Sequence, residues 1–121
     1  MRSYITAMQA GDWDAGMAHF ADDVVIHVPG RSRLAGTRRG RAEVEAYLRG
    51  ALGDGTVHAS VELIDMLVGE DHVGLVVHEV LRHGDRVLDM RRSNVYRVRD
   101  GAITEISIFE ADQHGVDEFF G

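Results

Sequence analysis

The chain has 121 residues and a formal charge of −7 with neutral histidines, and it contains no cysteine and no lysine. This length predicts a single domain over residues 1–121 with one hydrophobic core. The missing residue types exclude disulfides, thiolate nucleophiles, thiolate metal sites and lysine Schiff-base chemistry.

The acidic charge balance makes nucleic acid and anionic membranes unfavourable partners. The sequence has no uncharged apolar stretch of ~18 residues, so we expect no membrane span. The polar N-terminal segment predicts no signal peptide. We therefore expect a cytoplasmic protein that binds neither nucleic acid nor membranes.

Two helices are predicted at the start of the chain. Apolar residues recur at helical spacing over residues 1–8, and Gly11 is placed to end this first helix. Asp12 is a candidate N-cap for a second helix, whose apolar residues follow at helical spacing over residues 13–20.

The next segments predict a strand, a loop and a third helix. The β-branched run at residues 24–28 indicates a short strand, which Pro29-Gly30 should end. The polar, arginine-rich segment 30–40 is expected to be a loop. Apolar residues at helical spacing indicate a helix over residues 44–52, which Gly53-Asp54-Gly55 should stop.

The second half of the chain predicts an antiparallel meander of four strands and a final helix. The β-rich runs cover residues 57–67, 73–82, 87–98 and 102–111. Two of the breaks place glycine beside Asp or His, which favours the positive φ of a tight hairpin turn. Asp112 is a candidate cap for the final helix. Helices followed by a block of strands indicate the α+β class.

One strand of this block is apolar on both faces. By alternation, Leu75, Val77 and Leu81 point to one side, whereas Val76 and Val80 point to the other. Because a half-solvated sheet would alternate more cleanly, one face is expected to cover the helices and the other to contact a second copy of the chain. A monomer with a chance apolar pattern is the alternative.

Three stretches carry a family resemblance: GDWDAGMAHFADDVVIHVPG at 11–30, GTRRGRAEVEAYL at 36–48 and NVYRVRDGAITEISIFEADQ at 94–113. Through them, nearly the whole chain resembles the NTF2-like superfamily, in particular its SnoaL-like and ketosteroid-isomerase-like branch. The resemblance implies a cone, in which N-terminal helices pack on a curved antiparallel sheet around an apolar cavity, and homodimers that form through the sheet. This fold hosts isomerases, dehydratases, epoxide hydrolases, polyketide cyclases and binding proteins, so the cavity residues must decide the function.

The resemblance also locates family sites that are changed in this chain. The proton-shuttling aspartate of the ketosteroid isomerases falls on Val28, which cannot move a proton. The oxyanion hole of those enzymes falls on Tyr4 and Asn94, and both side chains can donate a hydrogen bond. The carboxylates of the limonene-epoxide-hydrolase branch fall on His78 and Ile108, and the cyclases of the SnoaL group have an acid near the second position. Neither the hydrolase nor the cyclase activity therefore transfers directly. A packing role with a tied-off hydroxyl is the alternative for Tyr4.

The remaining residues that the resemblance places in the cone form the predicted site. We expect His78 to be a general acid or base, because histidine titrates near neutral pH. Arg92 could orient it or stabilise an enolate oxygen. The predicted catalytic residues are thus His78, Arg92, Asn94 and Tyr4, and a structural strand histidine is the alternative for His78. The predicted ligand-binding residues are Trp13, Val28, Tyr47, Met90, Tyr96, Ile106, Ile108 and Glu110.

Other polar residues receive structural interpretations. Glu110 is expected to be a rim carboxylate paired with an arginine. His27 is expected to face away from the position of Val28 in a structural role, with a place at the cavity entrance as the alternative. The arginines of segment 31–41 are expected to pair with surface carboxylates, with a ligand carboxylate as the alternative. The histidine spacing predicts no metal site, and the glycine pattern predicts no dinucleotide cofactor.

These observations predict a pocket protein for a small apolar ligand, without metal or cofactor. The first hypothesis is a cofactor-free isomerase, dehydratase or polyketide cyclase that acts on a small apolar ketone, polyketide or steroid-like metabolite by acid–base chemistry. The second is a non-catalytic protein that binds a hydrophobic ligand or serves as an accessory subunit. The loss of aspartate at Val28 and Ile108 favours the second hypothesis, and the polar cavity lining favours the first.

Overall fold

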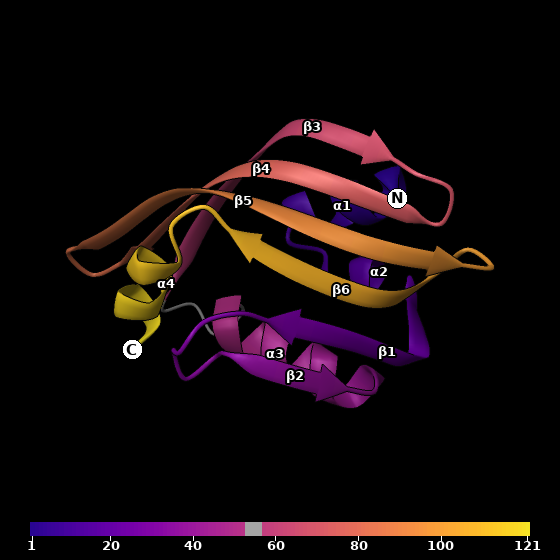
Figure 1. Cartoon of the computed structure of the whole chain (residues 1–121), viewed down its shortest axis with the longest axis horizontal. Helices are drawn as coiled ribbons and strands as arrows, with labels where there is room; N and C mark the ends of the chain where they lie inside the picture. Colours follow the sequence, from indigo (N-terminus) through magenta and orange to yellow (C-terminus); the bar gives the residue numbers. More distant parts are fainter. Residues whose placement is uncertain (53–56) are drawn as a thin grey trace.

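The computed structural model describes residues 1–52 and 57–121. The elements in these ranges are α1 (Arg2–Gln9), α2 (Trp13–Met17), β1 (Phe20–Val28), β2 (Gly36–Arg39), α3 (Arg41–Leu52), β3 (His58–Val68), β4 (His72–His83), β5 (Arg86–Arg99), β6 (Ala102–Glu110) and α4 (Gln113–Phe120). The strands form one curved sheet in the order β2-β1-β6-β5-β4-β3, with α1, α2 and α3 on one side and α4 at one end (Figure 1). The predicted α+β cone is confirmed.

The two predicted aspartate caps hold the starts of α2 and α4. The Asp12 carboxylate accepts a hydrogen bond from the Ala15 amide at 3.2 Å, and Asp112 accepts one from the Gly115 amide at 2.9 Å. Each cap satisfies an amide that has no partner within its helix. The second helix is shorter than predicted, because Phe20 already begins β1.

The first strand and its neighbour differ from the prediction. β1 begins four residues earlier than expected, and β2 lies within the segment predicted to be a loop. β2 pairs antiparallel with the end of β1, from Val25↔Arg39 to Val28↔Gly36. Its sequence GTRR has no apolar residue and it lies at the sheet edge, so no hydrophobic alternation marks it as a strand. The predicted stop of α3 at residues 53–55 lies outside the described residues.

The predicted four-stranded meander is confirmed as β3 to β6, and every pairing within it is antiparallel. Asp100 and Gly101 form the β5–β6 turn with φ of 53° and 79°. Two consecutive positive φ values are what a tight hairpin needs to match the twist of its strands, and Asp-Gly tolerates them. β1 joins the meander by pairing in parallel with β6.

The core lies between the concave face of the sheet and the helices. A larger cluster of buried residues joins α1, α2 and α3 to the sheet, and a smaller one joins α4 to β4 and β5. Tyr4, Met17 and Ile26 are central to the first, and Leu81 and Phe119 belong to the second. Within the described ranges, none of the helices combines the length and the apolar character that crossing a membrane requires.

Candidate functional site

A cavity of about 340 Å³ lies between the sheet and the helices. Its wall is mostly apolar, with side chains from α1, α2 and α3 on one side, the strands on the other and α4 at one end. The polar side chains of this wall that matter below are Tyr4, Tyr47, Glu79, Arg92, Asn94, Tyr96 and Glu110. An apolar cavity with a few convergent polar groups is the usual form of a small-molecule site.

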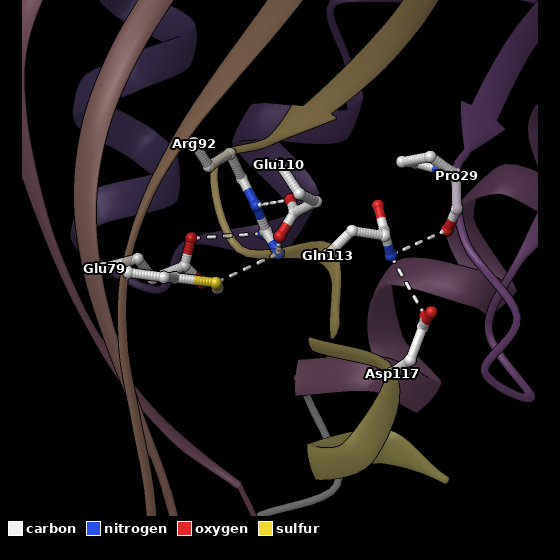
Figure 2. A network of polar contacts seen from close by, with 7 residues as sticks. Pro29, Glu79, Arg92, Glu110, Gln113 and Asp117 are labelled. Atoms are coloured by element: carbon white, nitrogen blue, oxygen red, sulfur yellow. Dashed lines mark hydrogen bonds and ion pairs between the residues drawn. The ribbon is translucent and has the colours of Figure 1, made fainter. Parts of the chain in front are cut away.

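An ion triad made by three neighbouring strands occupies part of this wall. Arg92 on β5 lies directly opposite Glu110 on β6, and Glu79 extends from β4 (Figure 2). The Arg92 Nε and Nη2 atoms bind the two oxygens of Glu110, the second at 3.2 Å. The Arg92 Nη1 atom lies 3.2 Å from Glu79 Oε2, and Nη2 lies 3.9 Å from the Met90 sulfur. The guanidinium is therefore held on three sides.

The triad is buried and carries more negative than positive charge. The exposed fractions of the Glu110, Glu79 and Arg92 side chains are 1%, 5% and 14%. Burial raises the pKa of the Glu79 carboxyl, Arg92 opposes the rise, and Glu110 adds to it. Burial would lower the pKa of Arg92, but the two glutamates outweigh it and the pKa lies above its usual value. Arg92 thus stays charged, and Glu79 binds a proton more readily than an ordinary glutamate.

The two carboxylates differ in the number of oxygens that Arg92 binds. Both oxygens of Glu110 are engaged by the guanidinium in a bidentate pair. Arg92 engages only one oxygen of Glu79, and among the described residues no hydrogen bond is made to Glu79 Oε1. Because Glu79 lines the cavity, this oxygen is the acid–base atom of the triad that a ligand could meet.

A second polar group surrounds Tyr4, Asn94 and Tyr96. The rings of Tyr4 and Tyr96 lie 5.3 Å apart and both side chains are buried. Burial raises the pKa of each hydroxyl, so both stay protonated. The side chains of Tyr4 and Asn94 lower the pKa of the Tyr96 hydroxyl, which burial raises, and this pKa also responds to Arg92 and Glu79. The two polar groups of the cavity are therefore close enough to interact electrostatically.

Tyr47 on α3 lies at the edge of the triad. Burial raises the pKa of its hydroxyl, while Arg92 and Arg38 act against the rise. The Arg38 guanidinium lies 4.5 Å from the centre of the Tyr47 ring, and its Nη1 atom donates to the Leu34 carbonyl at 2.6 Å. This arginine fixes the Tyr47 ring by a cation–π contact.

The arginine-rich segment mainly ties elements together. Arg41 donates to the carbonyls of Met17 and Phe20 at 3.0 and 3.3 Å and pairs with Glu45 at 3.5 Å. Arg33 donates to the Phe120 carbonyl at 3.1 Å. The expected pairing with surface carboxylates thus holds for Arg41, but backbone carbonyls are the more frequent acceptors here.

The C-terminal helix covers one end of the cavity. Gln113 donates to the Pro29 carbonyl at 3.4 Å and to Asp117 at 3.0 Å (Figure 2). Asp117 also accepts from the amides of Arg31 and Ser32 at 3.0 and 3.2 Å. These bonds connect α4 to the segment after β1 and place Val116 and Phe120 in the cavity wall.

Most predicted site residues lie where the resemblance placed them. Ten of the twelve line this one cavity: Tyr4, Trp13, Val28, Tyr47, Arg92, Asn94, Tyr96, Ile106, Ile108 and Glu110. Glu110 does pair with an arginine, but it is buried rather than at the rim. His27 faces away from the cavity, as expected, and its ring bonds to Thr37 at 3.1 Å and to Glu105 at 2.9 Å.

Two of the predicted site residues, His78 and Met90, do not line the cavity. His78 points to the other face of β4, where its Nε2 atom lies 2.7 Å from Asp89 Oδ1 and its side chain is 37% exposed. It cannot reach a ligand in the cavity, because its neighbours Val77 and Glu79 occupy the inner face. Met90 is buried in the cluster under α4, where its sulfur contacts the Arg92 guanidinium, and it does not line the cavity.

Glu79 is the functional residue that the sequence reasoning missed. It belongs to the same alternating set as Leu75, Val77 and Leu81, which lines the cavity. The alternation alone could therefore have identified it as a carboxylate inside an apolar row. Among the described side chains, no group of three His, Asp or Glu residues is arranged to hold a metal ion.

The comparisons agree with this fold and cavity. The SnoaL-like domain family matches residues 1–106. Uncharacterised proteins of Mycobacterium tuberculosis and Mycobacterium bovis are each 33% identical over 123 residues, which cover 99% of this chain and 92% of each relative. The protein is therefore of the NTF2-like class. Within that class, the chain belongs to the SnoaL-like domain family.

Solved structures show the same architecture. A protein of unknown function with a cystatin-like fold from Xanthomonas campestris has a TM-score of 0.89 and 32% identity, covering 99% of this chain and 94% of that one. An NTF2-like protein from Burkholderia xenovorans has a TM-score of 0.84 and 25% identity, covering 99% and 92%. At lower identity, an LEH-like epoxide hydrolase of M. tuberculosis (TM-score 0.74, 21% identity, 98% and 86% covered) and a computationally designed 17-OHP binder (0.75, 22%, 93% and 91%) share the fold alone.

The triad predicts a specific effect of removing its cation. Arg92→Met leaves two carboxylates buried without a partner, and we expect it to lower the free energy of unfolding by about 3–5 kcal/mol at pH 8. The loss should shrink at pH 5, because burial raises the pKa of Glu79 and the variant lacks the Arg92 charge that opposes this rise, so Glu79 takes up a proton more readily in the folded chain.

Chemical denaturation at the two pH values measures this effect. Arg82→Met, at an exposed arginine of β4, is the control and should change the free energy by no more than about 0.5 kcal/mol. Equal losses in the two variants, or a loss for Arg92→Met that does not depend on pH, would contradict the buried triad.

Proposed function

We propose that the chain is a cofactor-independent enzyme that moves a proton on a small, largely apolar ketone held in the cavity. The observation that carries this proposal is the buried triad, which presents one carboxyl oxygen of Glu79 to an apolar cavity. Glu79 has a raised pKa, and a carboxyl whose pKa approaches the working pH is an effective general base or acid.

The proposed step is enolisation. Glu79 Oε1 takes a proton from the carbon beside the carbonyl, and the electron pair of that C–H bond forms the enolate. The protonated Tyr96 and Tyr4 hydroxyls donate hydrogen bonds to the developing oxyanion. Glu79 then returns the proton to another carbon, which gives an isomerase, or the enolate expels a leaving group or closes a ring, which gives a lyase or a cyclase.

Arg92 and Glu110 act as positioning residues in this scheme. The guanidinium is occupied by the two carboxylates, so it holds Glu79 in place and limits the rise of its pKa. Glu110 in turn fixes the plane of the guanidinium through its bidentate pair. The neighbouring fold relatives, an LEH-like epoxide hydrolase and a designed 17-OHP binder, support the capacity of such a cone to accept apolar ligands.

Binding without turnover is the second candidate function. It is favoured by Val28 and Ile108, apolar residues that line the cavity where the resemblance places catalytic aspartates. In that case the cavity would hold a hydrophobic metabolite, and the triad would contribute only to the shape and polarity of the wall.

Proton exchange distinguishes these functions. We expect the protein to accelerate the exchange of the acidic C–H protons of 2-tetralone in D₂O, followed by proton NMR. Glu79→Gln should reduce the enzymatic rate by about 100-fold or more, because the amide cannot accept the proton. The change removes a buried charge and keeps the shape, so the folded state should persist.

His78→Ala is the matched control for this experiment. Since His78 lies on the outer face, its removal should leave the exchange rate unchanged. Full exchange activity in Glu79→Gln, or loss of activity in His78→Ala, would contradict the assigned base. Tight binding of 2-tetralone without any exchange would favour the binding function.

We also propose that a second copy of this chain covers the outer face of the sheet. Val76, Ser93 and Phe109 lie in one row across β4, β5 and β6, and the Phe109 side chain is 56% exposed. A large apolar residue exposed in the middle of a sheet is typical of an interaction surface. The apolar residues of this row can contact their own copies across a two-fold axis.

Phe109→Glu should convert the dimer into a monomer in sedimentation equilibrium, because two carboxylates would face each other at the contact. Val68→Glu is the control, since Val68 is 71% exposed at the end of β3 and lies outside this row. A monomeric wild-type chain, or a Phe109→Glu variant that remains dimeric, would contradict the proposal.

A further inference from the structure

The Asn94 side chain has an acceptor that the protein leaves unused. Its Oδ1 atom is buried and has no hydrogen-bond partner, and it is the only buried side-chain atom in this condition among the described residues. Asn94 lines the cavity from the middle of β5, between Arg92 and Tyr96. A buried polar atom without a partner is costly, so such atoms are rare in folded proteins.

The neighbours of Asn94 explain why no protein donor reaches this oxygen. Across the sheet, Asn94 lies opposite Leu75 on β4 and Ile108 on β6, which have no polar side-chain atoms. The nearby Asn94 side chain lowers the pKa of the Tyr96 hydroxyl, which burial raises. The free Oδ1 oxygen of Asn94 therefore has apolar side chains on both neighbouring strands.

The charge of the cavity restricts the ligand further. The triad holds two carboxylates against one guanidinium, and its side chains are at most 14% exposed. An anionic ligand would meet this excess negative charge in a region of low dielectric constant. A neutral ligand with a hydroxyl or N–H group avoids the repulsion and supplies the missing donor.

We propose that the ligand of this cavity is a neutral molecule whose hydroxyl group donates to Asn94 Oδ1, which makes Asn94 a specificity-determining residue. This rests on the proposed function and narrows its substrate class from apolar ketones to hydroxyketones and their enol forms. A simple ketone only accepts hydrogen bonds, so it would leave Asn94 Oδ1 unpaired. A hydroxyl pairs with it and also accepts a hydrogen bond from Tyr96.

A matched pair of probes tests this assignment. 2-Naphthol and 2-methoxynaphthalene share their rings and are neutral at pH 7, but only the first has a hydroxyl donor. Calorimetric titration of the wild-type chain should show about tenfold or greater preference for 2-naphthol, since loss of a paired buried acceptor is costly. Asn94→Leu removes the acceptor at similar volume and should abolish the preference.

Ile108→Val is the control variant, because Ile108 faces the same space opposite Asn94. It should weaken both probes to a similar extent and keep the preference for 2-naphthol. Equal binding of the two probes to the wild-type chain would overturn the assignment while leaving the cavity function intact. A preference that survives in Asn94→Leu would also overturn it, because another group would then recognise the hydroxyl. If neither probe binds, the cavity function itself fails as well.

Discussion

The structure depends on one interaction, the placement of the Arg92 guanidinium between two buried carboxylates. Transfer of these three charges from water costs several kcal/mol for each ion, and good geometry with further hydrogen bonds is needed to offset that cost. The bidentate pair with Glu110 and the single bond to Glu79 provide that geometry. The three residues come from β6, β5 and β4, so the triad also fixes the relative positions of the strands that form the cavity.

The register of the sheet determines which polar residues face the cavity beside the triad. Along β5, the inward residues Arg92, Asn94 and Tyr96 follow at intervals of two, which separates their Cα atoms by about 7 Å per step. The inward residues of β6 opposite the last two are Ile108 and Ile106. β5 therefore contributes Arg92, Asn94 and Tyr96 to a mostly apolar cavity, and Glu79 adds a carboxyl from the neighbouring β4. A ligand bound there would meet an acid–base group and a hydroxyl donor on adjacent strands.

Much of the fold could be predicted from the sequence, because its signals are local. Asp12 and Asp112 precede helices that they cap, and Asp100-Gly101 forms the turn that its residue types favour. β2 could not be found in this way, since an exposed edge strand of four residues needs no apolar alternation. Its pairing with β1 depends on a tertiary contact.

The site could be predicted only in part, for a reason that lies in strand geometry. The resemblance placed a family position on His78, whereas alternation places its neighbour Glu79 inside, and an error of one residue moves a side chain to the opposite face. The burial of Glu110 was also hidden, because it depends on tertiary packing around the Arg92–Glu110 pair and not on a local pattern. The unpartnered oxygen of Asn94 depends on the apolar residues across the sheet, which no local motif reports.

The titration of Glu79 tests the central claim most directly. Carbon-13 NMR of the side-chain carboxyls, with the Glu79 signal assigned by its absence in a Glu79→Gln sample, would follow the proton on this group. The account predicts a pKa above the ordinary glutamate value, because burial and Glu110 favour the neutral acid more than Arg92 opposes it. Since this pKa is higher in the folded chain than in the unfolded chain, stability should fall as the pH rises through it. A Glu79 carboxyl that titrates at or below the ordinary value would contradict a buried acid–base group in this cavity.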